Sequence, residues 1–190
     1  MKFLVSAIIL FVFSSFLFGQ KQSEPNCELQ DLAISAALGD TVSQHDLGVI
    51  FFRNEDYGKA AVMWRLSSNG GDVSSFNNLG YLTYYGKGVK QDYAEGIRLW
   101  RVAAEKGFPE SQIHLATAYS DNRHLKPDYI EAYAWAKTGK YFAGQIEDTE
   151  IIKMADARLI EVRKGLSSSQ LALAEKKATE YISKFAPKKI

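Results

Sequence analysis

Three histidines are the side chains best suited to chemistry in this chain of 190 residues. His45, His114 and His124 lie far apart, and none has a second histidine, a cysteine or a carboxylate at the spacing of a metal site or an acid–base pair. The turn Gly86–Gly88 is glycine-rich and basic, but no predicted strand precedes it, so phosphate binding is not expected. The sequence contains no G-x-S-x-G motif and no paired-carboxylate motif. We therefore predict no catalytic residue, no metal site and no cofactor.

The composition of the chain indicates which partners to expect. A hydrophobic content of 46% is typical of a folded domain with a buried core. The 23 basic and 22 acidic residues leave a formal net charge of +1, which argues against a nucleic-acid partner. Cys27 is the single cysteine, so it cannot close an internal disulfide, and we predict that it is buried and inert.

The N-terminal residues differ in character from the rest of the chain. Met1 and Lys2 precede the almost wholly apolar run Phe3–Phe18, and polar residues follow at once. This pattern predicts a signal peptide over residues 1–19, followed by a linker over residues 20–27. The protein is then expected to be periplasmic or secreted, with no stable membrane span after cleavage. An uncleaved anchor in the inner membrane is the alternative.

The remainder of the chain repeats itself with a period of 36 residues. An Asp-Tyr pair recurs at Asp56, Asp92 and Asp128, and a tryptophan lies downstream of each pair. Upstream of each pair lies a leucine followed by a small residue, as in Leu47-Gly48. Repetition at this period indicates stacked helix pairs, because one hairpin cannot bury its own apolar face. We therefore predict an all-α, right-handed solenoid of antiparallel helix hairpins.

The repeat also predicts the organisation of the chain. A solenoid over residues 28–144 consists of a capping helix and three hairpins, and a C-terminal helical hairpin cap and a disordered tail follow it. The predicted bounds are about 41–70, 73–107 and 109–140 for the hairpins, 145–186 for the cap and 187–190 for the tail. The small residue after each leucine should let the partner helix approach closely. The tryptophans Trp64, Trp100 and Trp135 should be buried.

The best-defined repeat, Gln91–Gly107 with the preceding Leu79-Gly80, resembles the Sel-one-like repeat (SLR) family, which is related to the tetratricopeptide repeats. The resemblance covers about residues 33–139 and implies a protein-binding scaffold. Some exported members of the family are immunity proteins that neutralise phospholipase effectors of type VI secretion. Cysteine-rich members have been linked to β-lactam hydrolysis, but this chain lacks their paired cysteines. A cell-wall or lactam hydrolase is therefore kept only as the alternative function.

The first helix of each hairpin is expected to line the concave side of the solenoid. Tyrosine and arginine are enriched at interface hot spots, and we expect Tyr81 and Tyr84 at the centre of the site. The alternative is that some of these tyrosines pack between layers. The function predicted is an exported protein–protein interaction module, either an adaptor or an inhibitor of the immunity type, whose partner is an envelope protein or a secreted phospholipase-type toxin. The predicted partner-binding residues are His45, Phe52, Arg53, Asn77, Tyr81, Tyr84, Tyr85, Thr117 and Asp121.

Overall fold

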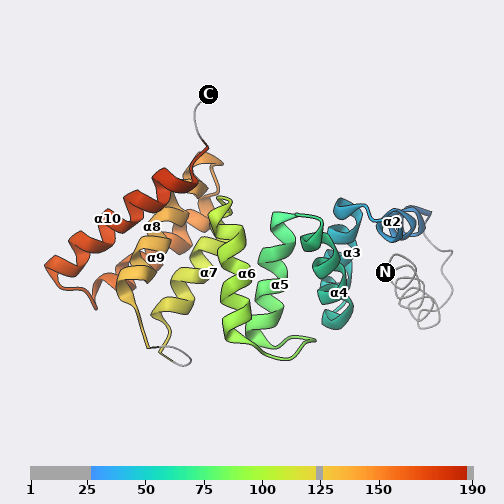
Figure 1. Cartoon of the computed structure of the whole chain (residues 1–190), viewed down its shortest axis with the longest axis horizontal. Helices are drawn as coiled ribbons and strands as arrows, with labels where there is room; N and C mark the ends of the chain where they lie inside the picture. Colours follow the sequence, from blue (N-terminus) through green and yellow to red (C-terminus); the bar gives the residue numbers. More distant parts are fainter. Residues whose placement is uncertain (1–26, 123–125, 188–190) are drawn as a thin grey trace. The chain divides into compact units, whose positions relative to one another are not determined.

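The protein is helical throughout the part of the chain that a computed structural model describes, residues 27–122 and 126–187, and no strand occurs within those ranges. Figure 1 shows the order of the helices. They are α2 (Cys27–Ala37), α3 (Thr41–Arg53), α4 (Tyr57–Asn69), α5 (Val73–Tyr85), α6 (Tyr93–Glu105), α7 (Pro109–Ser120), α8 (Tyr129–Gln145), α9 (Thr149–Arg163) and α10 (Ser168–Phe185). The predicted all-α helical repeat is confirmed.

Several predictions fall on residues outside those ranges. They are the signal peptide (1–19), the linker up to residue 26, His124, and positions 188–190 of the tail. None of the described helices is both long and apolar enough to cross a membrane.

The chain divides into two compact units, residues 1–92 and 93–190. The first unit contains α2 to α5 and the second contains α6 to α10. The boundary therefore lies inside the hairpin predicted at 73–107. Each unit has its own core.

Five connections between the described helices use the same tight turn, in which one residue has a left-handed backbone conformation. Glycine supplies the positive φ at Gly39 (99°), Gly71 (96°) and Gly107 (84°), whereas Glu55 (60°) and Glu147 (56°) supply it in the other two turns. In every case the amide of the next residue donates to the carbonyl five positions upstream, at 2.9 to 3.2 Å. A side chain in this conformation costs on the order of 1 kcal/mol, so each unit contains one strained turn.

The residue after the left-handed position is the N-cap of the next helix. In four of the five turns it is an aspartate whose carboxylate accepts the amide hydrogen three residues later, at Asp40, Asp56, Asp72 and Asp148. These N-caps satisfy amides that have no partner within the helix. In the fifth turn Pro109 begins α7, as a proline at the first helical position should.

Trp64 is the central core residue of the first unit, with 3% of its surface exposed. It lies directly on Gly48 of α3, where an added Cβ would fall 2.4 Å from two atoms of the indole ring. The indole Nε1 donates a hydrogen bond to the His45 carbonyl at 3.2 Å. The close approach predicted at the small residue after Leu47 is therefore present between α3 and α4.

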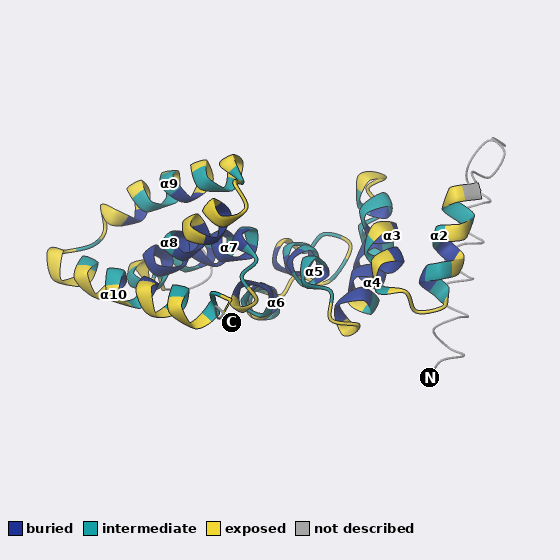
Figure 2. Cartoon of the chain, turned by 90° about the horizontal axis from the view of Figure 1, so that it is seen from above, coloured by how far each residue is buried: buried dark blue, intermediate teal, exposed yellow. Residues whose placement is uncertain are grey.

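Helix α8 is the centre of the second unit and packs against α7, α9 and α10. Figure 2 shows α8 buried over most of its surface, whereas α9 and α10 alternate between buried and exposed residues. One core cluster joins Ala132 and Tyr133 of α8 to Val162 of α9 and Ala174 of α10. The alanines let the helices approach closely, so α8 is covered on several sides.

The predicted burial of the three tryptophans is confirmed, with exposed fractions of 3%, 1% and 0% in chain order. They do not share one register, however. Trp64 lies eight residues after Asp56, whereas Trp135 lies seven residues after Asp128. One position along an α-helix rotates a side chain by about 100°. Trp135 therefore faces a different neighbour from Trp64.

Candidate protein-binding site

Four aromatic side chains form a continuous surface on the first unit, which we call the aromatic face: Phe52, Tyr57, Tyr81 and Tyr85. The ring centroid of Phe52 lies 5.3 Å from that of Tyr57 and 6.2 Å from that of Tyr81. Tyr81 lies 4.9 Å from Tyr85, one helical turn further along α5. All four rings are half-buried or exposed, and Tyr85 keeps 41% of its surface in solvent. Three helices, α3, α4 and α5, therefore contribute to one surface.

The aromatic face rests on the core of its unit. Phe52 packs on Trp64 with a centroid distance of 5.5 Å, and Trp64 is itself held over Gly48. The rings are thus fixed from below by a buried indole. A rigid aromatic surface of this kind binds a partner at a low cost in conformational entropy.

Lys87 completes the aromatic face. Its ammonium nitrogen lies 5.3 Å from the centroid of the Tyr57 ring and 5.2 Å from that of the Tyr81 ring, the geometry of a double cation–π contact. A hydrogen bond with Tyr81 is the main reason that the pKa of Lys87 is raised above its ordinary value, and charge interactions with Tyr81, Tyr57 and Glu55 act in the same direction. Lys87 therefore remains a cation at neutral pH.

The structure brings together three of the predicted partner-binding residues, Phe52, Tyr81 and Tyr85. Arg53 follows Phe52 at the end of α3 and is exposed. His45 is half-buried, and its Nδ1 lies 3.1 Å from the Asp46 carboxylate. Among the described residues this contact with Asp46 does not connect His45 with the rings of the aromatic face, so its place in the site stays a prediction.

Asn77 and Tyr84 differ from their predicted exposure. Their exposed fractions are 2% and 4%, so neither is available to a partner. The reason is helical geometry, because residues 77, 80 and 84 follow the i, i+3, i+7 spacing of one face, and Gly80 on that face is also buried. Tyr81 and Tyr85 lie on the neighbouring stripe of α5, which stays accessible.

Thr117 and Asp121 belong to the second unit, whereas the aromatic face lies in the first. The Thr117 hydroxyl donates to the Ile113 carbonyl within α7, at 3.0 Å. Both residues border an open, polar pocket of about 410 Å³, whose other lining residues are Ser120, Asn122, Tyr129, Arg158 and Glu161.

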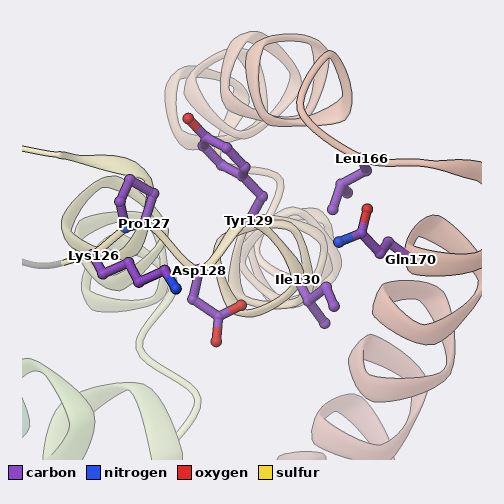
Figure 3. Close-up of a pocket in the computed structure, with 7 residues that line it drawn as sticks. All are labelled: Lys126, Pro127, Asp128, Tyr129, Ile130, Leu166 and Gln170. Atoms are coloured by element: carbon purple, nitrogen blue, oxygen red, sulfur yellow. The ribbon is translucent and has the colours of Figure 1, made fainter.

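A second open pocket, of about 370 Å³, lies at the start of α8 (Figure 3). The Asp128 carboxylate points into this region, but it already caps α8 by accepting the Glu131 amide hydrogen at 3.0 Å. Tyr129 lies against Gly165, where an added Cβ would be 2.6 Å from the ring. These groups stabilise the fold, and within the described ranges no three metal-ligating side chains gather at one point. The pocket is a weaker candidate than the aromatic face.

Sequence reasoning missed Tyr57 and Lys87. Tyr57 was visible only as the second residue of the recurring Asp-Tyr pair, and Lys87 only as part of a turn between two glycines. Tyr57 and Tyr81, the two tyrosines that Lys87 bridges, lie 24 residues apart in the sequence. Nothing in their spacing indicates that they are neighbours in space.

Helix pairs joined by a recurring turn, with a rigid aromatic surface on one side, define a helical-repeat scaffold. The Sel1 repeat family matches this chain at residues 77–108 and 109–138. These two adjacent segments of the chain are therefore similar to Sel1 repeats. Proteins with this repeat generally act as non-catalytic scaffolds for protein–protein interaction and are often extracellular or periplasmic.

Solved structures agree with this assignment. A protective antigen of uropathogenic Escherichia coli strains, which displays an SLR fold, is 28% identical, with a TM-score of 0.74 over 96% of this chain. This chain spans only 38% of the length of that antigen. A Sel1 repeat protein from Oxalobacter formigenes is 24% identical and shares the fold, with a TM-score of 0.56 over 70% of this chain and 98% of the other. No curated protein matches the sequence.

Proposed function

We propose that this protein is an exported interaction module that binds a partner protein through the aromatic face. The observation that carries the proposal is the set of four accessible rings, Phe52, Tyr57, Tyr81 and Tyr85, fixed over a buried tryptophan. Tyrosine in a rigid surface is typical of binding hot spots. A contiguous group of partly exposed rings is the kind of apolar surface that marks an interaction site.

The proposal includes export through the apolar segment 1–19, followed by action as an adaptor or as an inhibitor of the immunity type. Mass spectrometry of the protein from the envelope fraction of its host tests export. A mature N-terminus near Gly19-Gln20 supports it, and an intact Met1 in a membrane-bound product contradicts it. Loss of a partner's enzymatic activity on binding would indicate an inhibitor, and unchanged activity an adaptor.

Site-specific photo-crosslinking tests the aromatic face in the host. A photoreactive amino acid at position 85 should form a discrete protein adduct that Tyr81→Ala abolishes. The matched control is position 141, because Tyr141 lies in the other unit and has a similar exposed fraction, 38% against 41%. Equal crosslinking at both positions, or an adduct that persists in Tyr81→Ala, would contradict the proposal.

The same residues can be tested by affinity once the partner is identified. Tyr81→Ala combined with Tyr85→Ala should weaken binding by at least about thirtyfold, or roughly 2 kcal/mol, because truncation of hot-spot rings has effects of that size. Tyr141→Ala should leave the affinity unchanged. Thermal melts of all variants should agree to within a few degrees, since neither Tyr81 nor Tyr85 is a buried residue.

A further inference from the structure

Lys87 differs from the neighbouring Lys59 in how its charge is balanced. Lys59 forms an ion pair with Asp56 one helical turn away. Among the described residues no carboxylate forms an ion pair with Lys87, whose ammonium instead lies over the rings of Tyr57 and Tyr81. An ammonium has three N–H donors, and aromatic faces do not use all of them. The aromatic face therefore presents a cation that can still bind an anion.

The position of this cation is set by the turn that carries it. Gly86 and Gly88 both have positive φ, 68° and 67°. An added Cβ at Gly88 would fall 2.4 Å from the Gly58 amide nitrogen, so the turn packs directly on the start of α4. The Gln91 side chain also donates to the Tyr84 carbonyl at 3.0 Å and ties the turn to α5. The backbone that presents Lys87 is thus ordered before any partner binds, which lowers the cost of binding.

From this arrangement we infer that the partner of the aromatic face is an acidic peptide segment in which an Asp or Glu side chain lies next to an aromatic or aliphatic one. The carboxylate would meet the ammonium of Lys87, and the apolar neighbour would pack on Phe52, Tyr81 and Tyr85. The inference rests on the proposed function and names the chemistry of its partner. Charge complementarity selects the acidic segment, and the adjacent rings select its apolar residue.

The surface favours a peptide over a nucleic acid. A nucleic-acid groove needs a track of several cations along the phosphate backbone. Here one lysine is in contact with the rings, and Glu55 lies close enough to interact electrostatically with it. One pre-positioned cation within an apolar surface suits a single carboxylate.

Selection from a random linear peptide library displayed on phage, with the full chain as bait, tests this inference. Peptides enriched on the native protein should carry Asp or Glu beside an aromatic or aliphatic residue. Lys87→Glu should abolish the acidic preference and select Lys or Arg in its place. Lys90→Glu is the matched control, because Lys90 lies just beyond the same turn and is exposed, and it should select the same acidic peptides as the native chain.

Affinities of one enriched acidic peptide complete the test. It should bind Lys87→Glu at least about tenfold more weakly than Lys90→Glu, and added salt should weaken its binding to the native chain. If Lys87→Glu melts early, Lys87→Gln replaces it, and this neutral variant should lose the acidic preference without gaining a basic one.

The outcomes separate the two proposals. Enriched peptides that depend on Tyr81 and Tyr85 but lack acidic residues would overturn this inference and leave the proposed function standing. An absence of peptides whose binding depends on these tyrosines would overturn the proposed function as well. Tighter binding of a single-stranded oligonucleotide than of any acidic peptide would point to a nucleic-acid surface and also overturn the inference.

Discussion

Trp64 and Trp135 are both buried, yet they stabilise different contacts in the two units. Trp64 packs within its own hairpin, between Gly48 and Phe52, and leaves the rings above it accessible. Trp135 is fully buried, and its centroid lies 4.5 Å from that of Tyr181 on α10. The first unit therefore presents the rings next to its tryptophan, whereas in the second unit α10 packs on Trp135.

A shift of one residue accounts for this difference. Counted from the capping aspartate, the position of Trp64 corresponds to Ala136, and Trp135 precedes it. Helix α8 contacts α7 at a small residue that faces an aliphatic side chain instead of an indole, because an added Cβ at Gly139 would lie 2.7 Å from Ile113 Cδ1. The register of each tryptophan thus determines the neighbour on which it packs, Gly48 of the same hairpin for Trp64 and Tyr181 of α10 for Trp135.

Truncation of either tryptophan should have the largest effect. Trp64→Ala and Trp135→Ala should each lower the free energy of unfolding by about 3–5 kcal/mol, because each empties a buried aromatic site. Hydrogen exchange should distinguish them. Trp135→Ala should speed exchange in α10, and Trp64→Ala should speed it in α3. If hydrogen exchange in α10 is no faster in Trp135→Ala than in the native protein, the contact with Trp135 does not stabilise α10, and this difference between the two units is wrong.

The close approach at Gly48 should be the next most sensitive feature. Gly48→Ala should destabilise the protein by about 1–3 kcal/mol, since its Cβ would overlap the ring of Trp64. Gly144→Ala is the control, because nothing lies within 4 Å of an added Cβ there. In a helix this control should be neutral or slightly stabilising. If Gly48→Ala and Gly144→Ala change the free energy of unfolding equally in a denaturant titration, α3 and α4 can move apart without loss of stability.

The covering helix of the second unit should be sensitive to pH through Glu175. The Tyr133 hydroxyl donates to this carboxylate at 2.6 Å, and Lys137 forms an ion pair with it. Burial alone would raise the pKa of Glu175, but the bonds from Lys137 and Tyr133 and the charge of Arg163 outweigh it and lower the pKa.

A lowered folded-state pKa means that the contribution of Glu175 to stability is fully present above its ordinary pKa of 4.5 and is lost as the pH falls through the folded value. Glu175→Gln should therefore cost about 1 kcal/mol at pH 7, a value reduced by solvent screening of the partly exposed carboxylate, and almost nothing at pH 3. Glu150→Gln, which removes the exposed pair with Lys153, should have little effect at either pH. A pH-independent difference in unfolding free energy would contradict this role for the ion pair.

The smallest effect should come from the strained turns, one in each unit. Glu55→Gly and Glu147→Gly should each stabilise the protein by about 0.5–1 kcal/mol, because glycine adopts a positive φ without the steric cost of a side chain. Gly71→Ala, in the same kind of turn, should destabilise it. If thermal melts show that one of the two Glu→Gly changes stabilises the protein and the other destabilises it, the glutamate in the destabilised variant makes a contact that offsets its backbone strain.

The sequence by itself determined the helical repeat and the burial of the tryptophans. These features depend on local spacing and on residue type, which a single chain displays directly. It also placed Phe52, Tyr81 and Tyr85 at the candidate site, together with Asn77 and Tyr84, which the structure buries.

Only the tertiary structure decided which neighbour each face meets. The period of a helix shows that Tyr84 and Tyr85 point in different directions, but not which of them is covered. Lys87 joins the aromatic face because its turn packs on α4, which brings the ammonium between two rings that lie 24 residues apart in the chain. Such contacts depend on how whole helices pack together, and no spacing within one segment contains that information.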